Sequence, residues 1–248
     1  MKIAALILAC ALAFTAQPAL AQGVDNSAYA SLLDKHLENG LVDYAGLKAE
    51  EYKLDAYLDL MSNVDVDSLD SDSRLAFWIN AYNAWTLKLI LRDYPDVESI
   101  KDYGGFFTSP WEIDMVEAEG ELYTLDEVEH GIIRKRFDEP RIHFAVNCAS
   151  MSCPPLRAEP YAGDKLDRQL EEQTVEFIND PENTYFKDGT LYVSRIFKWY
   201  AEDFVPPGVA EFVARHARGS LRAELEAAGG DIEVKYLEYD WSLNDAGR

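Results

Sequence analysis

Apolar residues recur at helical spacing along most of the chain, and this periodicity predicts a mainly helical protein. Residues 74–92 are apolar on nearly every face, which is typical of a helix buried at the centre of a domain. The serines and aspartate at 71–73 supply N-cap candidates for that helix. Further helices are expected over residues 26–38, 47–61, 124–136, 164–179, 196–204, 208–216 and 220–228.

Alternating apolar and polar positions predict a few short strands among these helices. Residues 141–147 alternate as a half-buried strand does, and residues 232–239 are predicted to form a terminal strand. Glu119-Gly120 and Asp188-Gly189 are typical of hairpin turns and are each flanked by strand-like segments. We therefore expect a single α+β domain, largely helical, with its central buried helix packed on a small mixed or antiparallel sheet.

The N-terminus has the features of a secretory signal peptide. Lys2 precedes an apolar run over residues 3–15, and Ala19-Leu20-Ala21 provides a cleavage site. The prediction is a signal peptide at 1–21 and one domain at 22–248, in the periplasm or secreted. Cys10 leaves with the peptide, and lipid anchoring through it is disfavoured because Leu8 stands where a small residue is usual. No later segment is long and apolar enough to predict a membrane span.

The charge balance argues against two classes of partner. The chain has 23 Lys and Arg against 45 Asp and Glu, a net charge of −22, and loss of Lys2 makes it 22 − 45 = −23. Such an acidic surface repels phosphate backbones and anionic lipids. Nucleic-acid binding and adhesion to membranes are therefore not expected.

Candidate chemistry is concentrated in residues 143–157, HFAVNCASMSCPPLR, which carry both remaining cysteines and a histidine. Cys148 is either a reactive thiol with a histidine partner or one half of a structural disulfide with Cys153. On a straight strand His143 and Cys148 would lie roughly 16 Å apart on opposite faces. His143 is therefore not the automatic partner of Cys148, and His130 is a rival.

His130 lies on a predicted helix in a polar stripe with Asp126 and Arg134, four residues to either side. The stripe is either a histidine with a carboxylate that orients it or a solvated, salt-bridged face, and spacing alone favours the latter. Asn80 and Asn83 share a face of the central helix and need hydrogen-bond partners there. We expect their amides to bind loop backbone, although they could line a polar cleft.

Four segments resemble the hallmark blocks of the domain of unknown function 547 family, in order and spacing: residues 76–85 (AFWINAYNAW), 125–134 (LDEVEHGIIR), 143–157 and 196–204 (IFKWYAEDF). The terminal YDWSLN resembles the ending of its bacterial members. The resemblance implies that Glu129, His130, His143 and Cys148 match recurring family positions. It also implies that Cys153 matches a position that is serine in plant-type relatives, so that the role of Cys148 needs no disulfide there.

These residue types predict a thiol-dependent hydrolase or acyl transferase, with chemistry of the papain or transglutaminase kind. Cys148 would be the nucleophile, His130 or His143 the base and Glu129 or Asp126 the orienting carboxylate. Asn80, Asn83 and Asn147 are candidate oxyanion donors. The alternative is a non-catalytic periplasmic binding or envelope-assembly module with a Cys148–Cys153 disulfide.

Other cofactor and partner classes are not predicted. The two histidines and two cysteines are ligand types that zinc accepts, but their spacing matches no recognised zinc pattern, so neither metal nor cofactor is expected. A peptide, a glycan or a small molecule all remain open as substrate, and the sequence predicts no oligomeric state.

Overall fold

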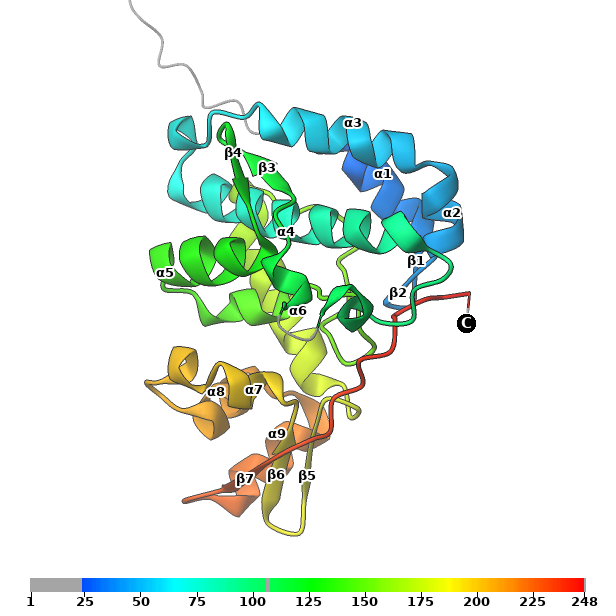
Figure 1. Cartoon of the computed structure of the whole chain (residues 1–248). Helices are drawn as coiled ribbons and strands as arrows, with labels where there is room; N and C mark the ends of the chain where they lie inside the picture. The colour runs from blue at the N-terminus through cyan, green and yellow to red at the C-terminus, as the bar shows by residue number, and fades with distance from the viewer. Residues whose placement is uncertain (1–23, 106–107, 248) are drawn as a thin grey trace, which may run out of the picture.

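The computed structural model describes residues 24–105 and 108–247 (Figure 1). The predicted signal peptide and Cys10 lie outside the described residues. The elements are, in order, α1 Ser27–His36, β1 Leu37–Glu38, β2 Leu41–Val42, α2 Tyr44–Ala49, α3 Glu51–Ser62, η1 Val66–Ser68, α4 Ser71–Asp93, η2 Ile100–Tyr103, η3 Pro110–Glu112, β3 Val116–Ala118, β4 Glu121–Tyr123, the π-helix η4 Glu127–Ile133, α5 Arg134–Arg136, η5 Pro140–Phe144, η6 Gly163–Lys165, α6 Leu166–Asn179, β5 Thr184–Lys187, β6 Thr190–Val193, α7 Ile196–Trp199, η7 Ala201–Phe204, α8 Val209–His216, α9 Gly219–Ala228 and β7 Glu233–Tyr236. Within these residues every helix is too short or too polar to span a membrane.

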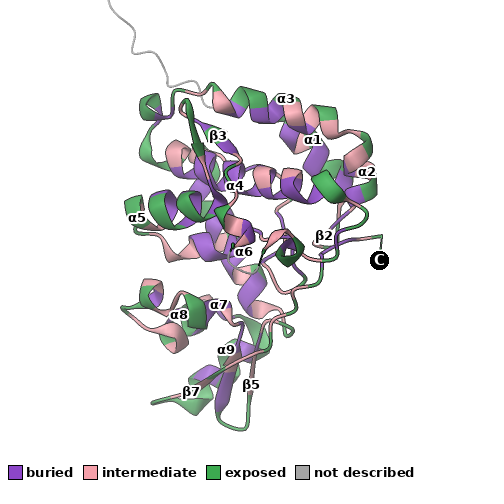
Figure 2. Cartoon of the chain, viewed as in Figure 1, coloured by how far each residue is buried: buried purple, intermediate pink, exposed green. Residues whose placement is uncertain are grey.

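The predicted central helix is confirmed as α4. Its N-terminus is capped by Asp70, whose carboxylate accepts a hydrogen bond from the Ser73 N–H at 2.8 Å. Trp78 is fully buried near its middle and packs edge-on against Phe77 and Tyr123. Helices α3 and η4 pack against α4, and Figure 2 shows buried residues along it. The helix whose sequence is apolar on nearly every face is therefore buried in the main core, as predicted.

The strands form small sheets, and the α+β class is confirmed. Strands β3 and β4 make an antiparallel hairpin at the predicted Glu119-Gly120 turn, and β3 contacts α4. Strands β5 and β6 are antiparallel across Asp188-Gly189, whereas β7 joins β6 in parallel. This mixed sheet lies below the main body in Figure 1, where β5 contacts α6 and α9 around a second apolar cluster.

The predicted strand at residues 141–147 is wrong. Residues 140–144 instead form the 3-10 helix η5, which starts at Pro140 and has the Glu139 carboxylate accepting from the Arg141 N–H. The Ala145 N–H then donates to the Ile142 carbonyl, so the chain turns back instead of extending. His143 is as buried as its apolar neighbours, so the alternation in the sequence does not separate a core face from a solvent face. The 16 Å separation expected for a strand therefore does not apply.

The C-terminal segment returns from the mixed sheet to the main body, as the red trace in Figure 1 shows. It forms backbone hydrogen bonds with the loop that follows Cys148: Met151 N–H donates to the Ser242 carbonyl, and Ser152 N–H to that of Asp240. Further on, the Val42 N–H donates to the Asn244 carbonyl. Residues nearly one hundred positions apart are thereby held in register beside the thiol.

Candidate functional site

Both cysteines and two histidines line one cleft of about 370 Å³. The cleft lies between η4, the end of α7, the Cys148 loop and the C-terminal segment. Its lining residues are Tyr82, Ser109, Trp111, Asp126, Glu129, His130, His143, Val146, Cys148, Cys153, Pro154, Ile196, Trp199, Tyr200, Tyr239 and Trp241. The fold thus brings Cys148, His130, His143 and Glu129, the candidate catalytic residues of the sequence, to one place.

The loop that carries Cys148 is fixed by two buried asparagines. Asn83 Nδ2 donates to the Ala145 carbonyl at 2.9 Å, and Asn83 Oδ1 accepts from the Asn147 N–H at 2.8 Å. The Asn147 side chain in turn donates to the Pro154 carbonyl and accepts from the Ala149 N–H. Ala149 has a φ of +59°, a left-handed conformation that non-glycine residues rarely adopt. The asparagines therefore hold the chain in a tight, strained turn around the thiol.

Hydroxyl groups surround the Cys148 sulfur. Its Sγ lies 3.1 Å from Ser150 Oγ and 3.3 Å from the Tyr239 hydroxyl oxygen. Burial on its own raises the pKa of this thiol, but hydrogen bonds from Cys153, Ser150 and Tyr239 outweigh that effect and bring the pKa below its ordinary value. A lowered pKa increases the thiolate fraction, which is the nucleophilic form.

Cys153 is a second free thiol beside Cys148. Its Sγ accepts a hydrogen bond from the Cys148 N–H at 2.8 Å. Burial and the hydrogen bond with Cys148 raise the pKa of Cys153 well above its ordinary value. The two thiols are therefore chemically distinct, because Cys148 favours the thiolate and Cys153 the protonated thiol.

His143 is oriented by a carboxylate that the sequence did not single out. Its Nε2 lies 2.6 Å from Asp203 Oδ2, and its ring stacks on Tyr200 at a centroid distance of 3.9 Å. Arg134 donates to both oxygens of Asp203. Burial raises the pKa of Asp203, but hydrogen bonds from His143 and Arg134 lower it far below its usual range. The remaining nitrogen, Nδ1, is buried and has no hydrogen-bond partner in the described structure.

The predicted stripe of Asp126, His130 and Arg134 exists, on and beside the π-helix η4. His130 Nε2 lies 3.6 Å from Asp126 Oδ1, and its Nδ1 lies 2.9 Å from Arg134 Nη1. The π-helical turn, in which the Arg134 N–H donates to the Glu129 carbonyl five residues back, places Glu129 in the cleft as well. His130 is solvent-accessible at the rim, whereas His143 is enclosed.

Neither histidine donates to or accepts from the Cys148 sulfur among the residues that the structure describes. The sulfur's partners there are hydroxyl groups and Cys153. Cys148 and His143 nevertheless line one cleft, and Asp203, which is not among the lining residues, orients the His143 ring. Hydrogen bonds between catalytic groups often form only in the substrate complex.

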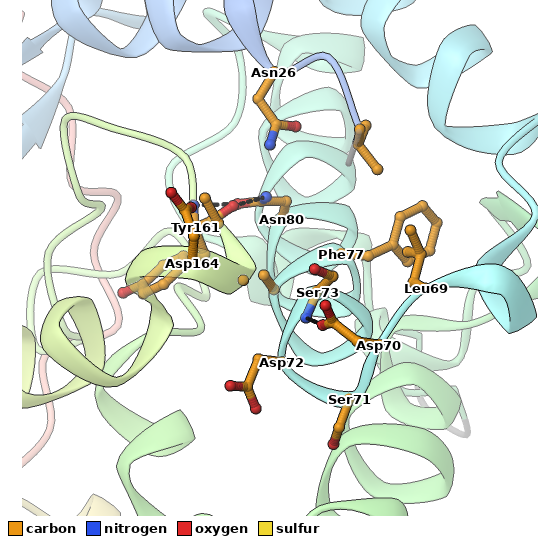
Figure 3. Close-up of a pocket in the computed structure, with 14 residues that line it drawn as sticks. Asn26, Leu69, Asp70, Ser71, Asp72, Ser73, Phe77, Asn80, Tyr161 and Asp164 are labelled. Atoms are coloured by element: carbon orange, nitrogen blue, oxygen red, sulfur yellow. Dashed lines mark hydrogen bonds between the residues drawn. The ribbon is translucent and has the colours of Figure 1, made fainter. Parts of the chain in front are cut away.

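The remaining asparagine candidates lie away from the cleft surface. Asn80 exchanges two hydrogen bonds with the backbone of Tyr161, as Figure 3 shows. It lines a larger hollow of about 740 Å³ at the start of α4, whose lining includes no cysteine or histidine. Asn83 and Asn147 support the thiol loop from behind and are not among the cleft-lining residues. All three asparagine side chains thus form hydrogen bonds with loop backbone, which satisfies their buried amide groups.

Within residues 24–105 and 108–247, no group of three or more His, Cys, Asp or Glu side chains is placed to hold a metal ion. A comparison with family models matches residues 66–178 to the family described as "Protein of unknown function, DUF547". This part of the chain is similar to that family, and the match agrees with the resemblance of its sequence blocks. Comparisons with curated proteins and with solved structures each found no match.

The cleft, together with the carboxylate that orients His143, draws on both the matched residues 66–178 and the chain beyond them. Cys148, His143, His130 and Glu129 lie within residues 66–178, whereas Asp203, Tyr239 and the two tryptophans at 199 and 241 follow them. No local pattern in the sequence marked Asp203, Tyr239 or Ser150 as site residues. The one available signal was the Ala201–Phe204 segment (AEDF), whose acidic residues interrupt an aromatic run.

Proposed function

We propose that the protein is a thiol-dependent hydrolase or acyl transferase in which Cys148 is the nucleophile and His143 the general base and acid. The proposal is supported by two groups that line one cleft. One is the Cys148 thiol, whose pKa is lowered, and the other is the His143 imidazole, which Asp203 holds in a fixed orientation.

The chemistry follows from the roles of these groups. His143 takes the proton of the Cys148 thiol, and the resulting thiolate attacks an acyl carbonyl carbon, so a C–S bond forms and the bond to the leaving group breaks. The leaving group takes the proton from the imidazolium of His143, whose positive charge the Asp203 carboxylate stabilises. Water, or another acceptor in a transferase, then attacks the thioester carbon while His143 removes its proton. The C–S bond breaks, and the departing sulfur takes the proton from His143, which regenerates the thiol.

His143 suits this role better than His130. His143 Nε2 is occupied by Asp203, so the free Nδ1 is the nitrogen left for proton transfer. His130 has Arg134 on one nitrogen and the half-exposed Asp126 near the other. We therefore assign His130 to the rim of the cleft, where it pairs with the charges of the stripe.

Alkylation of the native protein with iodoacetamide, followed by peptide mapping, tests the nucleophile. Cys148 should react well before Cys153, because only Cys148 has the lowered pKa. Cys153→Ser is the matched control and should retain the fast-labelling site, whereas Cys148→Ser should lose it. Preferential labelling of Cys153, or equal rates at both sites, would overturn the assignment.

A non-catalytic binding module is the second candidate, favoured by the contact between the two cysteines. On this hypothesis they form a disulfide that stabilises the loop, and the exposed Trp199 contributes to a ligand-binding wall. Intact-mass measurement of unreduced protein separates the candidates. A quantitative loss of two hydrogens with no alkylation favours the module, whereas two free thiols favour the enzyme.

We also propose that the protein is exported to a bacterial periplasm. Residues 1–21 support this because they combine Lys2, an apolar run and an A-x-A site. N-terminal sequencing of protein purified from a bacterial host's envelope fraction should begin at Gln22. Recovery in the cytoplasm with Met1 intact would contradict export.

A further inference from the structure

Glu129 has no assigned role in the proposed mechanism, although it is buried in the same cleft. Only 5% of its surface is exposed, and its Oε1 has no hydrogen-bond partner among the described residues. The sequence suggested Glu129 as the carboxylate that orients a histidine, but Asp203 does this for His143. A buried carboxylate oxygen without a donor is costly, so a donor from a ligand would stabilise it.

The other charges of the cleft act in the same direction. Apart from its histidines and thiols, its ionisable lining residues are Asp126, Glu129 and three tyrosines, and no lysine or arginine is among them. The nearby Arg134 is already engaged by Asp203, Glu202 and His130. Lys101, outside the lining, places an opposing positive charge near Cys148. With two carboxylates in the lining and a net charge of −22 over the whole chain, the cleft still favours cationic over anionic ligands.

An aromatic wall lines the same cleft as these carboxylates. It consists of Trp111, Trp199, Tyr239 and Trp241, whose neighbouring ring centroids lie 4.5–5.7 Å apart. One of its rings already holds a cation, because Lys101 Nζ lies 3.8 Å from the ring centroid of Trp241. Electron-rich ring faces next to a carboxylate are the surroundings that bind ammonium groups best.

We propose that the cleft takes small acyl donors that carry a positively charged amino group, and that Glu129 binds this group. The inference rests on the proposed function for its acyl chemistry, but the charge preference is a separate property of the cleft. The volume of about 370 Å³ lies near the lower end for ligand pockets, which fits a single aminoacyl unit. Glu129 would thus set specificity by pairing with the ammonium group while Cys148 attacks the carbonyl carbon.

Thiol reagents of different charge test this without requiring turnover. The reduced protein is treated with methanethiosulfonates that carry an aminoethyl, a sulfonatoethyl or a methyl group. In each case the Cys148 thiolate displaces sulfinate and forms a mixed disulfide, which peptide mapping quantifies. The rates are divided by those of a small free thiol. After this normalisation, the cationic reagent should react at least about tenfold faster than the anionic reagent.

Variants distinguish the effect of the Glu129 charge on the rate ratio from that of the protein's overall negative charge. Glu129→Gln should reduce the ratio at least about fivefold, and Glu129→Asp, which keeps the charge, should retain most of it. Glu121→Gln, which removes an exposed carboxylate outside the cleft lining, should change the ratio less than about twofold. The neutral reagent reports whether Cys148 itself remains intact in each variant.

A ratio that Glu129→Gln leaves unchanged would overturn the inference, as would a wild-type ratio near one. Neither result would affect the acyl chemistry, which is tested separately by acyl-enzyme formation. Conversely, a protein without acyl-transfer activity but with a Glu129-dependent ratio would retain the cationic site and lose the proposed function. The two failures are therefore distinguishable.

Discussion

His143 Nε2 and Asp203 Oδ2 lie 2.6 Å apart, although sixty positions separate the two residues in the chain. The contact joins η5 to η7 and continues to Arg134 on α5, which donates to both Asp203 oxygens. A histidine held in this way has one nitrogen committed to the carboxylate and the other free for chemistry.

Asp203→Asn should reduce kcat/KM about 10²- to 10⁴-fold, because His143 loses both its orientation and the charge that stabilises its imidazolium. Glu202→Gln is the matched control. Glu202 is 80% exposed and bonds Arg134 without contacting His143, so its variant should stay within about threefold of wild type. Steady-state kinetics with an activated ester measure both. Equal losses in the two variants would indicate that Arg134, and not Asp203, matters.

Asp203 should also contribute to the dependence of stability on pH. Its pKa in the folded state is below the unfolded value of about 4, so its contribution is present above that pH and is lost as pH falls through the folded pKa. The free energy of unfolding of the wild type should therefore fall more steeply below about pH 4 than that of Asp203→Asn. Urea titrations at a series of pH values measure this, and parallel curves would contradict the lowered pKa.

Tyr239→Phe should raise the pKa of Cys148, because it removes a hydroxyl 3.3 Å from the sulfur. The midpoint of the alkylation rate against pH should shift upward by about one unit. Tyr236→Phe, a change on the nearby strand β7, should leave the midpoint in place. A midpoint that is the same in Tyr239→Phe and wild type would show that the hydroxyl does not stabilise the thiolate.

Asn83→Ala should destabilise the fold by about 2–4 kcal/mol, since it leaves the Ala145 carbonyl and the Asn147 N–H buried without partners. Asn63→Ala, at an exposed helix end, should cost no more than about 0.5 kcal/mol. Equilibrium denaturation measures both. A cost for Asn83→Ala as small as that of the control would show that the thiol loop does not depend on this amide.

Local patterns in the sequence predicted much of the fold. The apolar run of α4 and the turn residues of both hairpins were visible in these patterns. The grouping of Cys148, His143, His130 and Glu129 instead came from the family resemblance, and the four residues line one cleft. The strand expected at 141–147 was wrong because alternation is also compatible with a 3-10 helix whose residues are all buried. The helix expected over residues 47–61 is divided into α2 and α3 at Glu50, and the apolar periodicity did not predict this break.

Long-range contacts account for what the sequence did not predict. Asp203 was one acidic residue among many, and only packing shows that it reaches His143. Tyr239 lies beside Cys148 because the C-terminal segment pairs with the loop at 150–152, and no local pattern encodes that pairing. Glu129 was not part of the predicted stripe of Asp126, His130 and Arg134. It lies in the π-helical turn of η4 and lines the cleft.

Cys148 is expected to form a covalent acyl intermediate with help from His143. Rapid-quench mass spectrometry during reaction of the reduced protein with p-nitrophenyl acetate detects such an intermediate. One acetyl group should appear on Cys148, accumulate more slowly in His143→Gln and be absent from Cys148→Ser, while Cys153→Ser acylates normally. Acetylation that is spread over other residues, or that is equally fast in His143→Gln, would contradict this expectation.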